Sequence, residues 1–295
     1  MRALVGIILN TFRESVRQPF YMLLLAGGAA AIVVMVWVPL FTFHSDIDMY
    51  KDLGLSFVLL FVMLAGLLAA ATGIAREVED KTAHTILSKA VGRPLFIVGK
   101  YVGAMAAVAL ATAVLGVVFA VAVYYRVELQ EVHGGHSHAI GGIGREIAAF
   151  RALQLNQALT VTPGLVMVVL QVGVLAGLAT ALSTRLSVAA SVALSLAAYV
   201  AGHLTVFLEG AVRAAGGVVS ALAQGAMAVV PFLEIFNINQ KLSHAVLAPF
   251  DAGGAGAADW VAVWTYVGWS ALYAVAYATA AICLAVILFR RRPLA

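Results

Sequence analysis

The sequence is poor in charged residues. Of its 295 residues, 11% are charged and 63% are hydrophobic, whereas a soluble domain carries about 25% charged residues. So few charges cannot cover a surface that faces water, and no polar stretch is long enough to form a soluble domain. We therefore predict that most of the outer surface faces lipid and that residues 1–295 form a single transmembrane domain.

Cysteine and catalytic motifs are scarce as well. The single Cys283 excludes an internal disulfide and a cysteine-based zinc or iron–sulfur site. No run of Lys and Arg with interleaved aromatic residues is present, so nucleic acid is not an expected partner. The sequence has no HExxH, no GxSxG, no paired intramembrane aspartates and no GxxxxGK[ST] nucleotide loop. We therefore predict that the chain is not an enzyme and binds no cofactor directly.

What the sequence has instead is long apolar runs. A helix needs about 20 predominantly apolar residues to cross a bilayer. Runs of this kind cover residues 20–43, 53–75, 95–125, 162–183, 186–208 and 260–289. Thr162 and Pro163 predict the start of the fourth helix, as its N-cap and first residue. The pattern predicts an all-α polytopic membrane protein with six transmembrane helices.

The first 18 residues differ from these runs. Apolar residues recur at helical spacing and charged residues line the opposite face; the apolar ones are Leu4, Ile7, Ile8, Phe12 and Val16. This pattern predicts a helix, residues 1–18, that lies in the membrane interface. A signal peptide is the alternative interpretation, but charged residues interrupt the apolar run and no cleavage site follows it.

The segment 209–259 is too apolar for an ordinary loop. Its run 218–230 is shorter than a transmembrane helix and ends at Pro231. Apolar runs of this length are typical of re-entrant or interfacial helices. We therefore predict re-entrant helices between the fifth and the last span, so that the number of spans stays at six.

The basic residues predict the orientation. If the N-terminus is cytoplasmic, most Lys and Arg residues lie on the cytoplasmic side and most Asp and Glu residues lie on the other side. This is the asymmetry found in multi-pass proteins. We predict that both termini are cytoplasmic, that 126–161 is an outer loop, and that the protein resides in the cytoplasmic (inner) membrane of a prokaryote.

Small residues recur every four positions on two of the predicted spans. They are Gly99, Gly103, Ala107 and Ala111 on the third span and Gly173, Gly177 and Ala181 on the fourth. Small residues at this spacing let helix backbones approach closely. The spacing predicts a packed helix bundle, although the general abundance of Gly and Ala is an alternative explanation.

The most highly charged segment, 76–93, lies between the second and third spans. It reads REVEDKTAHTILSKAVGR and is amphipathic at helical spacing. Gly92 and Pro94 are typical of a helix end and of a change of chain direction. The pattern predicts a short cytoplasmic helix that contacts another protein. A solvated linker that only follows the distribution of basic residues is the alternative.

Two stretches in this region resemble a known family. REVEDKT followed by ILSKAVGRPLFIVGKYVG is similar to the signature of ABC-2 type transporter permeases, except at Ala90, where that family often has proline. A second, partial match comprises Pro231, Glu234, Phe236 and Asn237. The resemblance covers the whole chain and includes the interfacial helix and six spans of these type V exporter-like proteins. Within the family, the chain is most similar to the branch associated with maturation of multi-copper enzymes.

The resemblance implies a function. It implies the membrane-spanning permease subunit of an ABC exporter, working with a second permease copy as a homodimer or heterodimer. A separate ABC ATPase subunit would bind ATP and Mg²⁺ and drive transport. The resemblance assigns coupling to that ATPase to Arg76, Glu77, Glu79, Asp80, Lys81, Thr82, Leu87, Ser88, Lys89 and Arg93. The alternative function is an ATPase-independent membrane channel or scaffold.

Two further groups of residues are candidate sites. His133, His136 and His138 lie close together in a Gly- and Ser-containing loop, where imidazoles can converge on copper or zinc. A polar loop with incidental histidines is the alternative. Gln171 and His203 are polar residues inside predicted spans, which often mark a transport pathway. Their alternative role is a hydrogen bond between helices.

Overall fold

The fold is described from a computed structural model. It covers residues 2–37, 46–79, 92–133, 151, 154–215, 230–238 and 255–290. All regular structure in these ranges is helical, which confirms the predicted all-α fold. The helices are α1 (Arg2–Val16), α2 (Pro19–Trp37), α3 (Asp46–Glu79), α5 (Arg93–His133), α7 (Thr162–Ser183), α8 (Val188–Ala215), the 3-10 helix η1 (Leu233–Phe236) and α11 (Ala255–Arg290).

Six helical segments in the described ranges are long and apolar enough to cross a membrane. They are Pro19–Trp37, Met49–Arg76, Arg93–Arg126, Gln154–Ser183, Val188–Thr205 and Trp260–Phe289. Each coincides with one of the six predicted runs. The prediction of six spans is therefore confirmed for this part of the chain.

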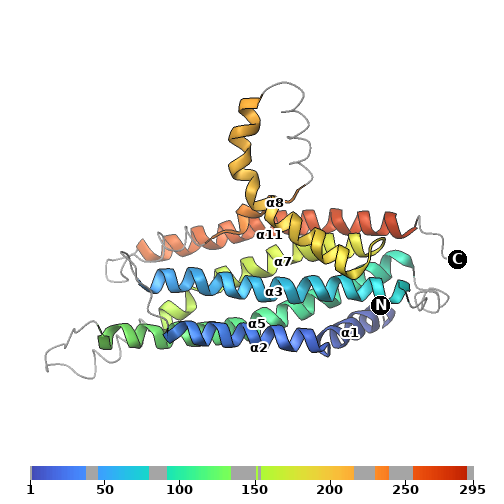
Figure 1. Cartoon of the computed structure of the whole chain (residues 1–295). Helices are drawn as coiled ribbons and strands as arrows, with labels where there is room; N and C mark the ends of the chain where they lie inside the picture. The colour runs from blue at the N-terminus through green and yellow to red at the C-terminus, as the bar shows by residue number, and fades with distance from the viewer. Residues whose placement is uncertain are drawn as a thin grey trace.

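The long helices lie side by side in one bundle (Figure 1). Helix α7 is at its centre and contacts α3, α5, α8 and α11, while α2 packs against α3 and α5. Helix α1 and the C-terminal end of α11 lie at the same end of the bundle. We call this the basic end, because Arg76, Arg93 and Arg185 also belong to helix ends or turns on this side.

Glycines on α5 and α7 are points of close helix contact. A Cβ atom at Gly103 would lie 2.6 Å from Cβ of Thr11 and 2.8 Å from the backbone oxygen of Ile8, both on α1. On α7, a Cβ atom at Gly177 would lie 3.5 Å from Cα of Ala278 on α11. Two of the small residues that recur every four positions thus let neighbouring helices approach closely, as such residues do in membranes.

Helix α1 is separate from α2. The chain turns at Arg17 and Gln18, where the Gln18 amide donates to the Ser15 carbonyl. Thr11 and Ser15 of α1 are buried, and α1 packs mainly against the first half of α5. The predicted N-terminal helix is present, and one of its faces is covered by α5.

Several element boundaries differ from the predicted ones. Helix α5 continues to His133, and residues 154–159 are again helical, so both ends of the predicted outer loop 126–161 are helical. The assignment of Thr162 as an N-cap is wrong, because the capping position is Val161 and the Thr162 hydroxyl donates backwards to the Leu159 carbonyl at 2.7 Å. Since the preceding residues are already helical, that helix end has little need of a side-chain cap.

The fifth span continues beyond its predicted end. Helix α8 extends to Ala215, and its C-terminal part turns away from the bundle (Figure 1). Within the predicted re-entrant segment 209–259, the structure describes the end of α8, residues 230–238 with η1, and the start of α11. Most of the short apolar run 218–230 lies outside the described residues.

Candidate functional site

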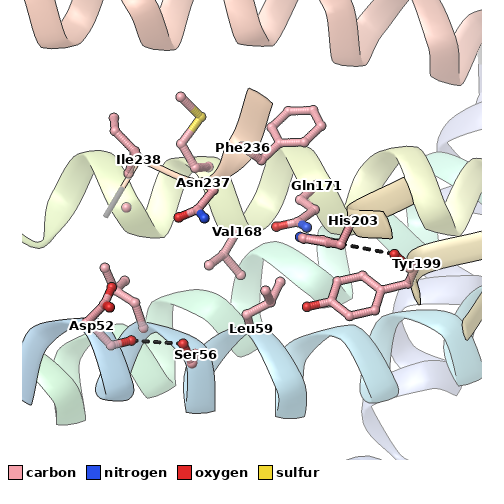
Figure 2. A pocket seen from close by; sticks show the side chains of 13 residues that line it. Asp52, Ser56, Leu59, Val168, Gln171, Tyr199, His203, Phe236, Asn237 and Ile238 are labelled. Atoms are coloured by element: carbon pink, nitrogen blue, oxygen red, sulfur yellow. Dashed lines mark hydrogen bonds between the residues drawn. The ribbon is translucent and has the colours of Figure 1, made fainter. Parts of the chain in front are cut away.

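A cavity of about 310 Å³ lies between α3, α7, α8 and the segment 230–238 (Figure 2). Its lining combines apolar side chains with several hydrogen-bonding groups. The lining residues are Asp52, Leu55, Ser56, Leu59, Gly164, Met167, Val168, Gln171, Tyr199, His203, Phe236, Asn237 and Ile238. Four sequence-distant segments therefore form this one site.

Two helix faces form most of the wall. On α3 the lining positions are 52, 55, 56 and 59, and on α7 they are 164, 167, 168 and 171. Both sets follow the spacing of a single helix face. The two faces approach closely at Gly164, where a Cβ atom would lie 2.7 Å from Cδ1 of Leu55. A larger residue at 164 would displace Leu55 and change the cavity.

Tyr199 and His203 enter the cavity from one face of α8, four residues apart. Their ring centroids are 4.6 Å apart, and Nδ1 of His203 lies 3.0 Å from the backbone oxygen of Tyr199. Since a carbonyl oxygen only accepts hydrogen bonds, Nδ1 carries the proton in this contact. In the neutral ring, Nε2 is then an acceptor. Figure 2 shows the Tyr199 ring extending toward Leu59.

The segment 230–238 is attached to α8 and α11. The Tyr266 hydroxyl donates to the Ile235 carbonyl at 2.6 Å, and the Phe232 amide donates to the Tyr273 hydroxyl at 2.8 Å. Gly202 of α8 leaves room for the segment, since a Cβ atom there would lie 2.6 Å from the backbone oxygen of Pro231. These contacts place Phe236, Asn237 and Ile238 on the cavity wall.

Gln171 is the most deeply placed polar group of the site. Its side chain is 4% exposed and lines the cavity. None of the residues that the structure describes forms a hydrogen bond with its amide. The amide is not among the fully enclosed polar atoms without a partner, so it reaches the space of the cavity. The Gln171 amide is therefore available to a polar molecule inside the cavity.

The charge of the cavity wall has one sign. Asp52 and Asn237 are exposed, whereas Gln171 and Met167 are buried, so the cavity extends from an exposed rim into the bundle. Among the described residues that line it, none is a lysine or an arginine. Asp52 is thus the one Asp, Glu, Lys or Arg among the described lining residues, and its carboxylate disfavours anionic occupants.

The structure brings the two predicted pathway residues together. Gln171 and His203 line the same cavity although they come from different helices, and no hydrogen bond joins them in the described structure. The sequence patterns did not single out Asp52, Ser56 or Tyr199. The spacing of four between Tyr199 and His203 was a usable signal. The approach of α3 to this face was not readable from the sequence.

The predicted coupling residues lie partly within the described structure. Arg76, Glu77 and Glu79 belong to the last turns of α3, and Arg93 is the first residue of α5. Side-chain positions are described for Arg76, which is exposed, and Arg93, which is half-buried. The predicted coupling residues Asp80, Lys81, Thr82, Leu87, Ser88 and Lys89 lie outside the described residues.

One lysine near this segment is buried. Lys100 of α5 is 3% exposed and its Nζ lies 3.6 Å from a carboxylate oxygen of Glu14 on α1. The same Nζ lies 5.9 Å from the centroid of the Phe96 ring. Lys100 belongs to the stretch ILSKAVGRPLFIVGKYVG of the family resemblance, and it joins α1 to α5 at the basic end.

The structure does not describe the side chains of the predicted histidine cluster. His136 and His138 lie outside the described residues, and only the backbone of His133 is placed, at the end of α5. Elsewhere in the described structure, no group of three His, Cys, Asp or Glu side chains could hold a metal ion. Metal binding by these three histidines stays a prediction.

The sequence matches the model of one known protein family. A family model described as "ABC-2 family transporter protein" matches residues 7–294, which includes every element that lines the cavity. Among curated proteins, the sequence finds no match.

Proposed function

This chain belongs to the ABC-2 transporter family, and from that premise we propose that it exports a substrate with energy from a separate ATPase subunit. The family and the six apolar helices make it a multi-pass membrane protein and a permease subunit that is not itself catalytic. The observation that carries the proposal is the continuity of α3, which connects the charged segment to the cavity.

Helix α3 provides a direct mechanical connection. It has 34 residues and is therefore about 50 Å long at a rise of about 1.5 Å per residue. Its last turns hold Arg76, Glu77 and Glu79, and its first half holds Asp52, Ser56 and Leu59 of the cavity. Helices transmit displacement as rigid bodies. A force applied to 76–93 would reach the cavity through one uninterrupted helix.

The basic end faces the cytoplasm in this proposal. Arg76, Arg93 and Arg185 belong to it, together with α1 and the end of α11, in keeping with the enrichment of Lys and Arg on the cytoplasmic side. The cavity then opens toward the outer half of the cytoplasmic membrane of a prokaryote. The proposal includes a second permease copy beside this one. Assignment to the copper-enzyme branch stays a prediction.

A crosslinking experiment tests the ATPase partner. A photoreactive amino acid replaces Glu79 in the full chain, which is expressed in its native membrane, irradiated and purified under denaturing conditions. We expect a crosslinked protein that contains a GxxxxGK[ST] nucleotide loop. In a separate co-purification without the crosslinker, Glu77→Gln together with Glu79→Gln should reduce recovery of this partner at least about tenfold, because charge-assisted contacts are lost.

The control replaces a carboxylate by an amide at the other end of the same helix. Asp46→Asn removes a carboxylate from the start of α3 and should leave ATPase recovery unchanged. If no nucleotide-hydrolysing protein is crosslinked at position 79, the proposed coupling is wrong. If transport survives in the Glu77→Gln/Glu79→Gln variant, an ATPase-independent channel is the better description.

A further inference from the structure

We propose that the cavity between α3, α7, α8 and the segment 230–238 binds a small organic ammonium ion with an apolar body. The idea that this molecule is also the transported substrate rests on the proposed function, whereas binding itself does not require an ATPase. The inference starts from the amide of Gln171, which has no hydrogen-bond partner among the described residues, is 4% exposed and lines the cavity.

Three acceptors face a common space. The Gln171 side chain offers its carbonyl oxygen, and when the ring of His203 is neutral it offers Nε2, because Nδ1 donates to the Tyr199 carbonyl. The Tyr199 hydroxyl, which also forms no hydrogen bond with the described residues, can accept as well. A primary ammonium group carries three donors and no acceptor. Its hydrogen-bonding needs therefore match this set.

The rest of the wall suits a positive charge and an apolar body. The Asp52 carboxylate lies on the rim, and the described lining includes no lysine or arginine. The rings of Tyr199 and Phe236 attract a cation through their electron-rich faces, an effect of about 0.5–2 kcal/mol per contact. Leu55, Met167 and Val168 supply apolar surface. An anion would meet the Asp52 charge and no lysine or arginine among the described lining residues.

The size of the cavity limits the ligand. Its 310 Å³ lies at the lower end of the range of about 300–1,000 Å³ occupied by small-molecule pockets. A single aromatic ring with a short aminoalkyl chain fits this volume. The cavity is therefore the size of a small molecule.

Binding to the purified full chain in lipid nanodiscs tests the proposal. The probe is 2-phenylethylammonium, compared with 2-phenylethanol, which is neutral, and with phenylacetate, which is an anion of similar size. Calorimetry and ligand-observed NMR should show the ammonium binding at least about tenfold more tightly than either analogue. No binding of the ammonium, or equal binding of phenylacetate, would overturn the proposal.

Two variants locate the site. Gln171→Leu keeps the side-chain volume but removes the amide, and should weaken binding of the ammonium about tenfold. Gln18→Leu makes the same change on a half-buried residue near the basic end, which pairs with Thr72, and should leave binding unchanged. Unaltered affinity in Gln171→Leu would place the ligand elsewhere and refute the inference.

A third variant covers the case in which Gln171→Leu does not fold. Ser56 is exposed on the rim, so Ser56→Phe narrows the opening without filling the buried core. It should abolish binding of the ammonium, and unchanged binding would refute the site. The outcomes are separable from the proposed function. Ammonium binding without an ATPase crosslink at position 79 would leave the site valid and remove the ATP-driven export.

Discussion

Lys100 illustrates how a single residue can join two helices of the bundle. Its side chain is 3% exposed, and Glu14 of α1 lies 3.6 Å from it. Because a charged amine inside a bundle is unfavourable without an acidic neighbour, we expect Glu14→Gln to destabilise the protein by about 1–3 kcal/mol. The measurement is chemical unfolding of the purified chain in detergent micelles.

The double variant serves as the control for this pair. In a Lys100→Met background, the lysine charge is gone, so Glu14→Gln should change stability much less than it does in the unmodified protein. A double-mutant cycle gives the interaction energy. An interaction energy near zero would mean that the pair contributes nothing to the attachment of α1.

Gly103 determines how closely α1 can approach α5. A side chain at this position would meet both Cβ of Thr11 and the backbone oxygen of Ile8, and a backbone atom cannot move without shifting its helix. We expect Gly103→Leu to lower the free energy of unfolding by about 1–3 kcal/mol, as overpacking does. Thermal unfolding followed by circular dichroism measures the effect.

A matched glycine is available for comparison. No atom lies within 4 Å of the position that a Cβ would take at Gly268 of α11, so Gly268→Leu should leave the melting temperature within experimental error. Equal destabilisation by the two substitutions would contradict a specific role for Gly103 in packing.

Among the elements, η1 and its flanking residues depend on two tyrosines for their position. Tyr273 accepts from the Phe232 amide and Tyr266 donates to the Ile235 carbonyl. Since a hydrogen bond contributes about 0.5–1.5 kcal/mol net, Tyr266→Phe combined with Tyr273→Phe should increase amide exchange in 230–238 several-fold. Hydrogen–deuterium exchange with peptide resolution measures this change.

The comparison variant for this element lies far from it. Tyr125 is exposed near the end of α5, and Tyr125→Phe should leave exchange in 230–238 unchanged. If the double variant also exchanges at the wild-type rate, the tyrosine hydroxyls do not hold the segment, and the apolar contacts of Leu233 and Phe236 are sufficient.

For the whole molecule, the distribution of basic residues predicts one orientation. In a Cys283→Ser background, no other cysteine remains. Ser187→Cys then places a thiol in the exposed turn between α7 and α8 at the basic end, and Arg151→Cys places one on an exposed residue outside the predicted spans. A membrane-impermeant maleimide should label position 151 in intact cells and position 187 only after permeabilisation.

The opposite labelling pattern would show that the orientation is the reverse of the predicted one. The charged segment 76–93 would then lie outside the cell, and the proposed ATPase coupling would be wrong. Labelling of both positions in intact cells would mean that the reagent enters the cells, which a cytoplasmic protein with an accessible cysteine would reveal, whereas the Cys283→Ser protein reports only nonspecific reaction of the maleimide. That cysteine-free protein therefore serves as the background control.

The sequence by itself determined the fold class and the number of spans. Apolar runs of about 20 residues leave a bilayer-spanning helix as the only way to satisfy the backbone inside lipid, and this requirement is local. The sequence also identified Gln171 and His203 as candidate pathway residues, because a polar residue inside an apolar run can be recognised without a structure.

Only the tertiary structure decided which polar residues share a site. Asp52, Gln171, His203 and Asn237 come from four segments, and their meeting depends on how α3, α7 and α8 pack. The sequence carries no simple periodicity for such contacts, because they depend on side-chain fit at positions such as Gly164 and Gly202. The structure likewise shows that one helix, α3, runs from the charged segment to the cavity. The sequence alone did not show which residues of α3 face that cavity.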